Sequence, residues 1–335
     1  MMKKYGLFFV VLCCISCQHT FLGSDPVNTP RNNFENLWST LDQKYSFFTY
    51  KKVDWNEVYL KYSPKIDNSM SDVKLFNVLF EMLSELKDSH VNLSSPFNVS
   101  RYEKQFASSP VNYEERIINK YLRSDYYVTG PLKHQFLNSG AVGYVRYSSF
   151  ENDVSSANID FVNTRFKDTK GIILDVRSNG GGNISNVFSL SSHFADKRRN
   201  VYTSYIKNGP GHEDFSGPND VYVSPSGTSF TKKVCVLTNR GSYSATSFLV
   251  LAMRNFPNVT IVGDTTGGGL GAPTGAELPN GWGFRFSCSR TITPEGDNFE
   301  DGIPPDIAIN LSSTDSKNGV DSIIETAISI IMSDN

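Results

Sequence analysis

A serine hydroxyl stands at a point of the sequence where nucleophilic chemistry is possible. Residues 234–238 form a short apolar run with β-branched members, which predicts a buried strand, and from Ala245 onward the apolar positions take helical spacing. Ser244 therefore falls at the start of a helix, where free N–H groups and the positive dipole end suit a developing negative charge. Ser244 is a candidate nucleophile beside an oxyanion site. The plain alternative is an N-cap, because serine is a preferred capping residue.

Three further features could complete such a site. The glycine-rich turn of residues 180–182 follows an apolar run, and glycines let backbone N–H groups approach a ligand closely. It is not a dinucleotide loop, because Ser185 stands where that motif needs its third glycine. His90 lies in a loop after a predicted helix, whereas the other histidines have no motif around them. Glu300 places a carboxylate just before the rigid turn of residues 302–305.

The order of these residues excludes common serine-hydrolase patterns. Every histidine precedes Ser244, so the Ser…Asp…His order of α/β-hydrolases is impossible, and no Gly-x-Ser-x-Gly motif surrounds this serine. An order of His, Ser and Glu stays open, because geometry defines a triad more than chain order does.

The elements that must position these residues fall into two regions. Residues 29–90 predict a small helical domain, with helices beginning after Thr29, Asp54 and Ser71 and the last one leading to His90. Residues 91–140 are interpreted as an irregular linking segment. Residues 141–335 alternate strand and helix patterns and predict an α/β core. Within it, Asn280-Gly281 is typical of a hairpin turn before alternating aromatic residues.

The N-terminus has the pattern of an export signal. Residues 1–16 combine a basic start with a short apolar run and end in a sequence that resembles a bacterial lipobox. We expect Cys17 to be the lipidated first residue of an exported bacterial lipoprotein, tethered by residues 17–28 to a membrane on the periplasmic or surface face of the cell envelope. The alternative is an ordinary secreted protein cut nearby. The formal net charge of −2, without a basic block, gives no indication of a nucleic-acid partner.

Taken together, the motifs resemble the S41 serine peptidases, the family of tail-specific (C-terminal processing) and tricorn-type proteases. The matching elements occur in family order from about residue 30 to residue 310. They are Tyr45-Ser-Phe-Phe, Val53-Asp-Trp, Leu86-x-Asp-x-His90, Asp175-x-Arg-x-Asn-Gly-Gly-Gly, Thr238-Asn-Arg-x-Ser-Tyr-Ser244-Ala, Gly263-Asp-Thr-Thr-Gly-Gly-Gly and Glu300-x-Gly-Ile-x-Pro-Asp306. The resemblance implies a crotonase/ClpP-like α/β core with an N-terminal helical domain.

The resemblance also assigns roles. Ser244 becomes the nucleophile, His90 the base and Glu300 the residue that orients it. Ser89 matches an auxiliary serine of tricorn-like members, although other members use glycine there. The oxyanion donors are the N–H of Ala245 and a glycine N–H at Gly180 or Gly181.

Two departures from the family pattern narrow the prediction. Gly269 fills the position where tail-specific members carry a catalytic lysine, which favours a histidine base with deprotonation at about pH 6–7.5. The length of the segment between the histidine loop and the core is at the lower limit for a domain, so we do not expect a complete PDZ domain there.

We therefore expect a serine endopeptidase that cleaves unfolded or flexible polypeptides through an acyl-enzyme, with no metal or cofactor. The alternative is an inactive peptidase fold that binds peptides or lipophilic ligands, and the oligomeric state stays open.

Overall fold

The helical N-terminal region forms as the capping signals predict. The computed structural model describes residues 27–102 and 109–333, so Cys17, the signal segment and most of the tether lie outside the described residues. The Thr29 side chain accepts the Asn32 N–H at the start of α2, and Asp54 caps α4 in the same way. The helices of this region are α2 (Pro30–Lys44), α3 (Phe48–Lys51), α4 (Trp55–Tyr62), the 3-10 turn η1 (Ser63–Lys65) and α5 (Asp72–Ser84).

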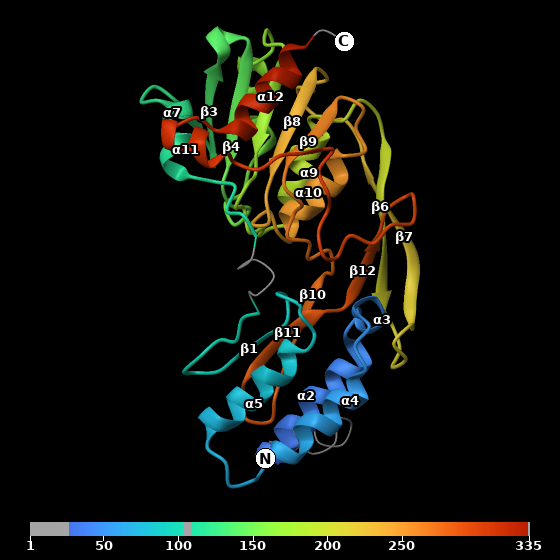
Figure 1. The fold of residues 1–335 in the computed structure, drawn as a ribbon. Helices are drawn as coiled ribbons and strands as arrows, with labels where there is room; N and C mark the ends of the chain where they lie inside the picture. Colours follow the sequence, from blue (N-terminus) through green and yellow to red (C-terminus); the bar gives the residue numbers. More distant parts are fainter. Residues whose placement is uncertain (1–26, 103–108, 334–335) are drawn as a thin grey trace, which may run out of the picture.

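The core is a seven-stranded sheet in the order β13-β9-β8-β5-β4-β3-β2 (Figure 1). The run from β4 to β13 is parallel, whereas β3 pairs antiparallel with β4 and β2 with β3. The strands are β2 (Tyr127–Thr129), β3 (Leu132–Leu137), β4 (Val142–Tyr147), β5 (Gly171–Asp175), β8 (Lys233–Thr238), β9 (Val259–Gly263) and β13 (Ile307–Ala308). The predicted α/β class is confirmed.

Helices cover both faces of this sheet, because its central strands are apolar on both sides. Ile172 and Leu174 pack on one side with α8 (Ser156–Arg165), α9 (Ser185–Ser192) and α10 (Ala245–Met253). Ile173 faces the other side, with α7 (Glu115–Leu122) and α12 (Ser322–Met332). The short helix α11 (Ser313–Asn318) precedes α12. No helix among the described residues is long and apolar enough to span a bilayer.

The prediction of an irregular linker at residues 91–140 is wrong for much of that segment. It contains β1 (Asn92–Ser94), α7, β2, β3 and the 3-10 turn η2 (Asn138–Gly140). β2 and β3 extend the core sheet, so the sheet begins at Tyr127 and not at residue 141. The alternation of β3 is hard to recognise because His134 and Gln135 are buried next to each other.

Two small sheets connect the core with the helical region. One has the order β1-β11-β10, with β10 (Pro273–Glu277) and β11 (Gly283–Ser287), and the other the order β12-β6-β7, with β6 (Arg199–Lys207), β7 (Phe215–Val223) and β12 (Ser289–Ile292). The predicted hairpin turn carries Gly281 at φ +82°. Trp282, Phe284 and Phe286 pack into the same core as the helices α2–α5.

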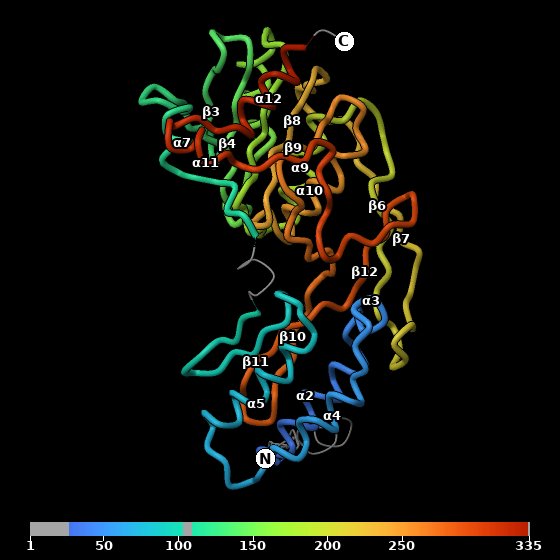
Figure 2. The backbone as a smooth tube through the Cα atoms, viewed as in Figure 1, coloured from blue at the N-terminus to red at the C-terminus, as the bar shows by residue number. Residues whose placement is uncertain are grey.

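This shared core explains how the histidine loop reaches the sheet. The tube trace shows β1, β10 and β11 running beside α5, below the sheet (Figure 2). His90 lies between α5 and β1, and β1 pairs with β11, with Asn92 opposite Arg285. The loop is therefore held at both ends, by α5 and by a strand from a distant part of the chain.

Candidate active site

Ser244 lies at the junction of β8 and α10. It occupies the N-cap position with φ 57° and ψ −123°. Such a conformation is strained for a residue other than glycine, and this kind of strain is concentrated at functional sites. The capping alternative is wrong for the side chain, because the Ser244 hydroxyl makes no cap hydrogen bond. Its Oγ lies 3.0 Å from His90 Nε2.

The backbone around Ser244 leaves N–H groups without partners. The Ser244 N–H donates to Gly268 O at 2.9 Å, whereas the N–H groups of Ala245 and Gly180 make no hydrogen bond within the described part of the chain. The Gly181 N–H donates to Asn179 Oδ1 at 3.0 Å. Of the two glycines that the sequence leaves open, Gly180 is therefore the one whose N–H is available to a ligand.

Gly181 serves the site through its lack of a side chain. It has φ +94°, and a Cβ there would lie 2.8 Å from Tyr243 O and 2.9 Å from Ala245 N. A Cβ at Gly180 would meet no heavy atom within 4 Å. The space beside the Ala245 N–H therefore exists because residue 181 is glycine.

His90 is buried, with 2% of its surface exposed. Its ring packs against Tyr243 at 4.9 Å between centroids, and its buried Nδ1 has no hydrogen-bond partner. Burial lowers the pKa of His90 to about 4, although the charge of Asp88 raises it, while Arg285 lowers it further. The expected deprotonation at about pH 6–7.5 is too high, because it started from the ordinary pKa of a histidine and left out desolvation.

Glu300 is 4% exposed and lies in the loop before Gly302. Its Oε2 accepts the Leu270 N–H at 2.7 Å. Because His90 Nδ1 has no partner, the direct Glu300–His90 hydrogen bond that an orienting residue would make is not formed in this structure. Burial, reinforced by the charge of Asp88, raises the pKa of Glu300 well above its ordinary value. The orienting role of Glu300 stays a prediction.

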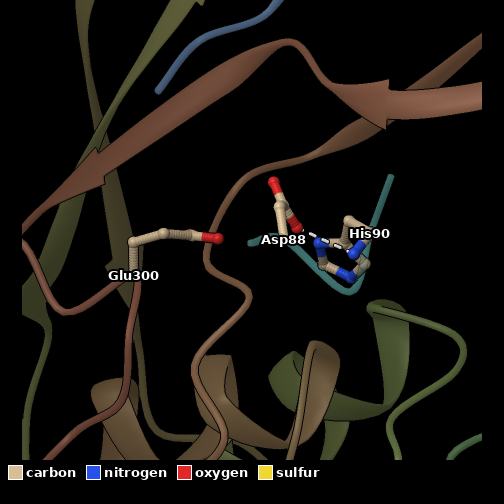
Figure 3. Close-up of side chains that lie close together, drawn as sticks. All are labelled: Asp88, His90 and Glu300. Atoms are coloured by element: carbon tan, nitrogen blue, oxygen red, sulfur yellow. Dashed lines mark hydrogen bonds between the residues drawn. The ribbon is translucent and has the colours of Figure 1, made fainter. Parts of the chain in front are cut away.

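Asp88 is a buried carboxyl group of this site that the sequence argument did not assign. It is 3% exposed; its Oδ1 accepts the His90 backbone N–H at 2.7 Å, and its Oδ2 accepts the Tyr45 hydroxyl at 2.8 Å. Figure 3 shows the Asp88 carboxyl between Glu300 and the His90 ring. The available signal was the aspartate two residues before the histidine, which is the spacing of a carboxylate that accepts a nearby backbone N–H.

The Ser89 hydroxyl does not hydrogen-bond to Asp88, His90 or Glu300. Its Oγ donates to the Tyr102 carbonyl at 2.7 Å. The Ser89 side chain also makes a hydrogen bond to the Tyr243 side chain. Burial and the charges of Asp88 and Glu300 raise the pKa of Tyr243 well above its usual value. The auxiliary role of Ser89 stays a prediction, and its contacts are those of a residue that holds the loop.

The only described side chains whose spacing suits a metal ion are those of this cluster. Asp88, His90 and Glu300 offer ligand atoms within 4.8 Å of one another, and all three residues are buried. Tyr45 and the His90 N–H already donate to Asp88, and the Leu270 N–H donates to Glu300. A metal ion would have to displace these hydrogen bonds, so the residues fit a hydrogen-bonded cluster better than a metal centre.

A cavity of about 640 Å³ opens beside the site, between the helical region and the core. It shares Lys51, Lys87, Gly267 and Asp301 with the crevice that contains Asp88, Ser89, Tyr243 and Glu300. Its size is that of a cavity that binds a small ligand or a few residues of peptide.

The fold and the site define a serine-type hydrolase class, and comparisons with known proteins identify the family. The sequence profile of Peptidase family S41 matches residues 141–309, and that of the tricorn protease C1 domain matches residues 26–84. The chain belongs to peptidase family S41, a family of serine-type peptidases.

Individual relatives agree with this assignment. A solved structure from Parabacteroides merdae ATCC 43184, described as a candidate peptidase, is 42% identical with a TM-score of 0.89 and covers 92% of this chain and 98% of its own. The carboxy-terminal processing protease CtpA of Bacillus subtilis (strain 168) is 27% identical over 172 residues, which are 51% of this chain and 35% of CtpA. The match thus spans about a third of that relative's length.

More distant structures support the fold alone. Mature CPAF is 13% identical with a TM-score of 0.67 and covers 90% of this chain and 96% of its own. The ClpP/crotonase-like core with an N-terminal helical region, predicted from the sequence, is confirmed as the fold of this chain.

Proposed function

We propose that this chain is a serine endopeptidase that hydrolyses peptide bonds through an acyl-enzyme. One observation carries the proposal: Ser244 Oγ lies 3.0 Å from His90 Nε2, at the start of a helix whose first N–H is unpaired. A hydroxyl within hydrogen-bond reach of a buried imidazole is the arrangement of an activated nucleophile. The low pKa of His90 keeps its imidazole neutral, and therefore able to accept a proton, across physiological pH.

The proposed reaction uses these groups in sequence. Ser244 Oγ attacks the carbonyl carbon of the scissile bond while His90 Nε2 accepts the hydroxyl proton. The N–H groups of Ala245 and Gly180 stabilise the negative charge that develops on the carbonyl oxygen. His90 then gives its proton to the departing amine, and the peptide C–N bond breaks to leave an ester on Ser244. Water, deprotonated by His90, hydrolyses that ester and restores the Ser244 hydroxyl.

The burial of the site supports a preference for unfolded or flexible polypeptides. His90, Asp88 and Glu300 are each less than 5% exposed. A peptide segment that can leave its own fold is brought to such buried groups more easily than a rigid surface loop. We expect hydrolysis of a denatured protein substrate, and much slower hydrolysis of the same protein when it is folded.

Covalent labelling tests the nucleophile. A serine-directed phosphonate should add mass to the peptide that contains Ser244, and Ser244→Ala should abolish the labelling. Ser242→Ala is the matched control, because the Ser242 hydroxyl is buried and donates to Val176 O at 2.9 Å. Labelling at Ser242, or labelling that persists in Ser244→Ala, contradicts the assignment. If the wild-type protein binds peptide but is neither labelled nor active, the alternative function, an inactive peptidase fold that binds peptides, is favoured.

We also propose that the chain is an exported lipoprotein anchored through Cys17. The support is the signal-like pattern of residues 1–16 and the lipobox-like end before Cys17. The anchor would hold the peptidase at the cell envelope, where exported polypeptides that have not folded are its substrates.

A further inference from the structure

A buried lysine of the helical region lies between two loops of the candidate site. Lys51 is the last residue of α3, and only 7% of its side chain is exposed. Its Nζ donates to the Lys87 carbonyl oxygen at 3.3 Å and to Asp301 Oδ1 at 2.9 Å. Lys87 lies three residues before His90, and Asp301 directly follows Glu300. One ammonium group therefore joins the two loops from a third part of the chain.

The burial of the Lys51 ammonium sets it apart from an ordinary surface ion pair. An exposed pair of lysine and carboxylate contributes little to stability. A buried ammonium is costly to remove from water, and hydrogen bonds and opposite charge must compensate for this. Burial lowers the pKa of Lys51, but the charge of Asp88 and the hydrogen bond and charge of Asp301 raise it above its ordinary value. Lys51 is therefore a cation at neutral pH, and its acceptors fix its position.

At the Lys87 end, the contact is made to a residue with unusual backbone angles. Lys87 has φ 49°, in the left-handed region, and a residue other than glycine keeps such a conformation only where its surroundings hold it. Its carbonyl accepts the Lys51 ammonium, and the next residues form a tight turn. Asp88 Oδ1 accepts the His90 N–H at 2.7 Å, and Asp88 O accepts the Val91 N–H at 3.1 Å. The Lys51 contact thus holds the start of the turn that presents His90.

At the other end, Asp301 also contacts the segment that leads to the nucleophile. Arg240, four residues before Ser244, donates from Nη1 to the carbonyl oxygens of Asp301 and Thr266, both at 3.2 Å. Asp301 therefore accepts the Lys51 ammonium on its side chain and the Arg240 guanidinium on its backbone. Through this residue the helical region is tied to the part of the core that carries Ser244.

We propose that Lys51 is a positioning residue, which holds the His90 loop at a fixed place relative to the segment that carries Ser244. The proposal deepens the proposed peptidase function and rests on it for its kinetic consequences. It gives α3 a part in maintaining the 3.0 Å distance between His90 Nε2 and Ser244 Oγ. A displacement of about 1 Å between reacting groups is enough to lower a rate about 100-fold.

Kinetics on the purified whole chain test the proposal. Lys51→Met keeps the length of the side chain but removes its donors and charge, and we expect kcat to fall about 10–100-fold with KM within about threefold. Asp301→Ala removes the carboxylate acceptor, and we expect a smaller fall of about 3–10-fold, because Lys51 keeps the Lys87 carbonyl. In the double variant kcat should be close to that of Lys51→Met, since both residues act through one contact.

Lys65→Met is the matched control. It also removes a lysine ion pair of the helical region, because Lys65 Nζ lies 3.0 Å from Glu81 Oε2, but both of these side chains are largely exposed. Its kcat should stay within about twofold of wild type.

Hydrogen–deuterium exchange with mass spectrometry gives a readout that does not depend on activity. In Lys51→Met we expect faster exchange in the peptides that cover residues 85–93 and 298–304, and unchanged exchange in β5 and β8. Lys65→Met should leave both loops at the wild-type rate. A lysine that only stabilised its own helical region would instead increase exchange in α2–α5 and leave residues 298–304 unchanged.

The outcomes distinguish this proposal from the function on which it rests. A wild type without labelling or turnover contradicts the peptidase function, and the exchange measurement then decides the role of Lys51 alone. If Lys51→Met keeps the wild-type kcat, if only its KM changes, or if the losses of the two single variants multiply in the double variant, Lys51 is not a positioning residue. Should a thermal melt show that Lys51→Met is unfolded, Asp301→Ala decides, because the Asp301 side chain is 64% exposed. An unchanged kcat in that variant overturns the proposal.

Discussion

The most direct perturbation of the candidate site is a single methyl group at Gly181. An ideal Cβ at this position lies 2.9 Å from Ala245 N, 2.8 Å from Tyr243 O and 3.0 Å from Ser244 Cβ. The first of these distances is the one at which a bound oxyanion would accept the Ala245 N–H. Gly181→Ala therefore either occupies the space of the oxyanion or shifts the loop that creates it.

The expected loss follows from removing one oxyanion donor. Mutations of this kind reduce kcat by about 10²–10³-fold, or about 3–4 kcal/mol of transition-state stabilisation. The positive φ adds a stability cost of about 1–3 kcal/mol, because alanine is strained in that backbone conformation. The assay is hydrolysis of a denatured protein substrate, with a thermal melt of the same samples.

Gly140→Ala provides a matched control for the strain. Gly140 has φ +93°, against +94° at Gly181, but a Cβ there meets nothing within 4 Å. It should lower the melting temperature by a similar backbone effect and leave kcat within about twofold. Gly180→Ala keeps its N–H and has open space around its Cβ, so it should lose less activity than Gly181→Ala. If Gly181→Ala keeps full kcat, or if Gly140→Ala loses as much, the oxyanion site is not where we place it.

Three further predictions concern pH and location. Because burial lowers the His90 pKa to about 4, kcat/KM of the wild type should rise as the pH passes about 4 and then stay flat to neutrality; a rise only above about pH 8.5 would return the base role to a lysine. The folded-state pKa of Glu300 is raised, so the stability that its neutral form contributes is present at low pH and is lost as the pH rises toward that pKa. The melting temperature of Glu300→Gln relative to wild type should therefore increase between pH 5 and 9, and a constant difference would show that Glu300 is ionised throughout. Cys17→Ala should convert a membrane-fraction protein into a soluble one, and a wild type already in the soluble fraction contradicts the anchor.

Local signals in the sequence were sufficient to single out the candidate nucleophile and the candidate base, whereas their roles came from the family resemblance. Ser244 stands where a β-branched run changes to helical spacing, and both patterns depend on neighbours within a few residues. His90 was found because a predicted helix leads into its loop. The caps at Thr29 and Asp54 and the turn at Gly281 form for the same reason, since their hydrogen bonds and backbone angles are set by adjacent residues.

The sequence pattern did not reveal how the linking segment folds. β3 pairs with the edge that β4 presents, and β2 pairs in turn with β3. The sequence pattern of these two strands is weak on its own because β3 carries buried polar residues. The strands in this segment form because they hydrogen-bond to neighbouring strands of the sheet, and their sequence alone does not show this pairing.

The electrostatics of the site was decided by the tertiary structure alone. Glu300 lies more than 200 residues from Asp88 along the chain, yet folding buries the two carboxyl groups beside each other and beside His90. The depressed pKa of His90 and the raised pKa of Glu300 both arise mainly from desolvation, which depends on the atoms that surround a group and not on its neighbours in sequence. The sequence by itself therefore determined which residue types were available and where the local turns would hold them. Only the packing of the helical region against the sheet decided which titratable groups are buried together, and which glycine N–H remains free.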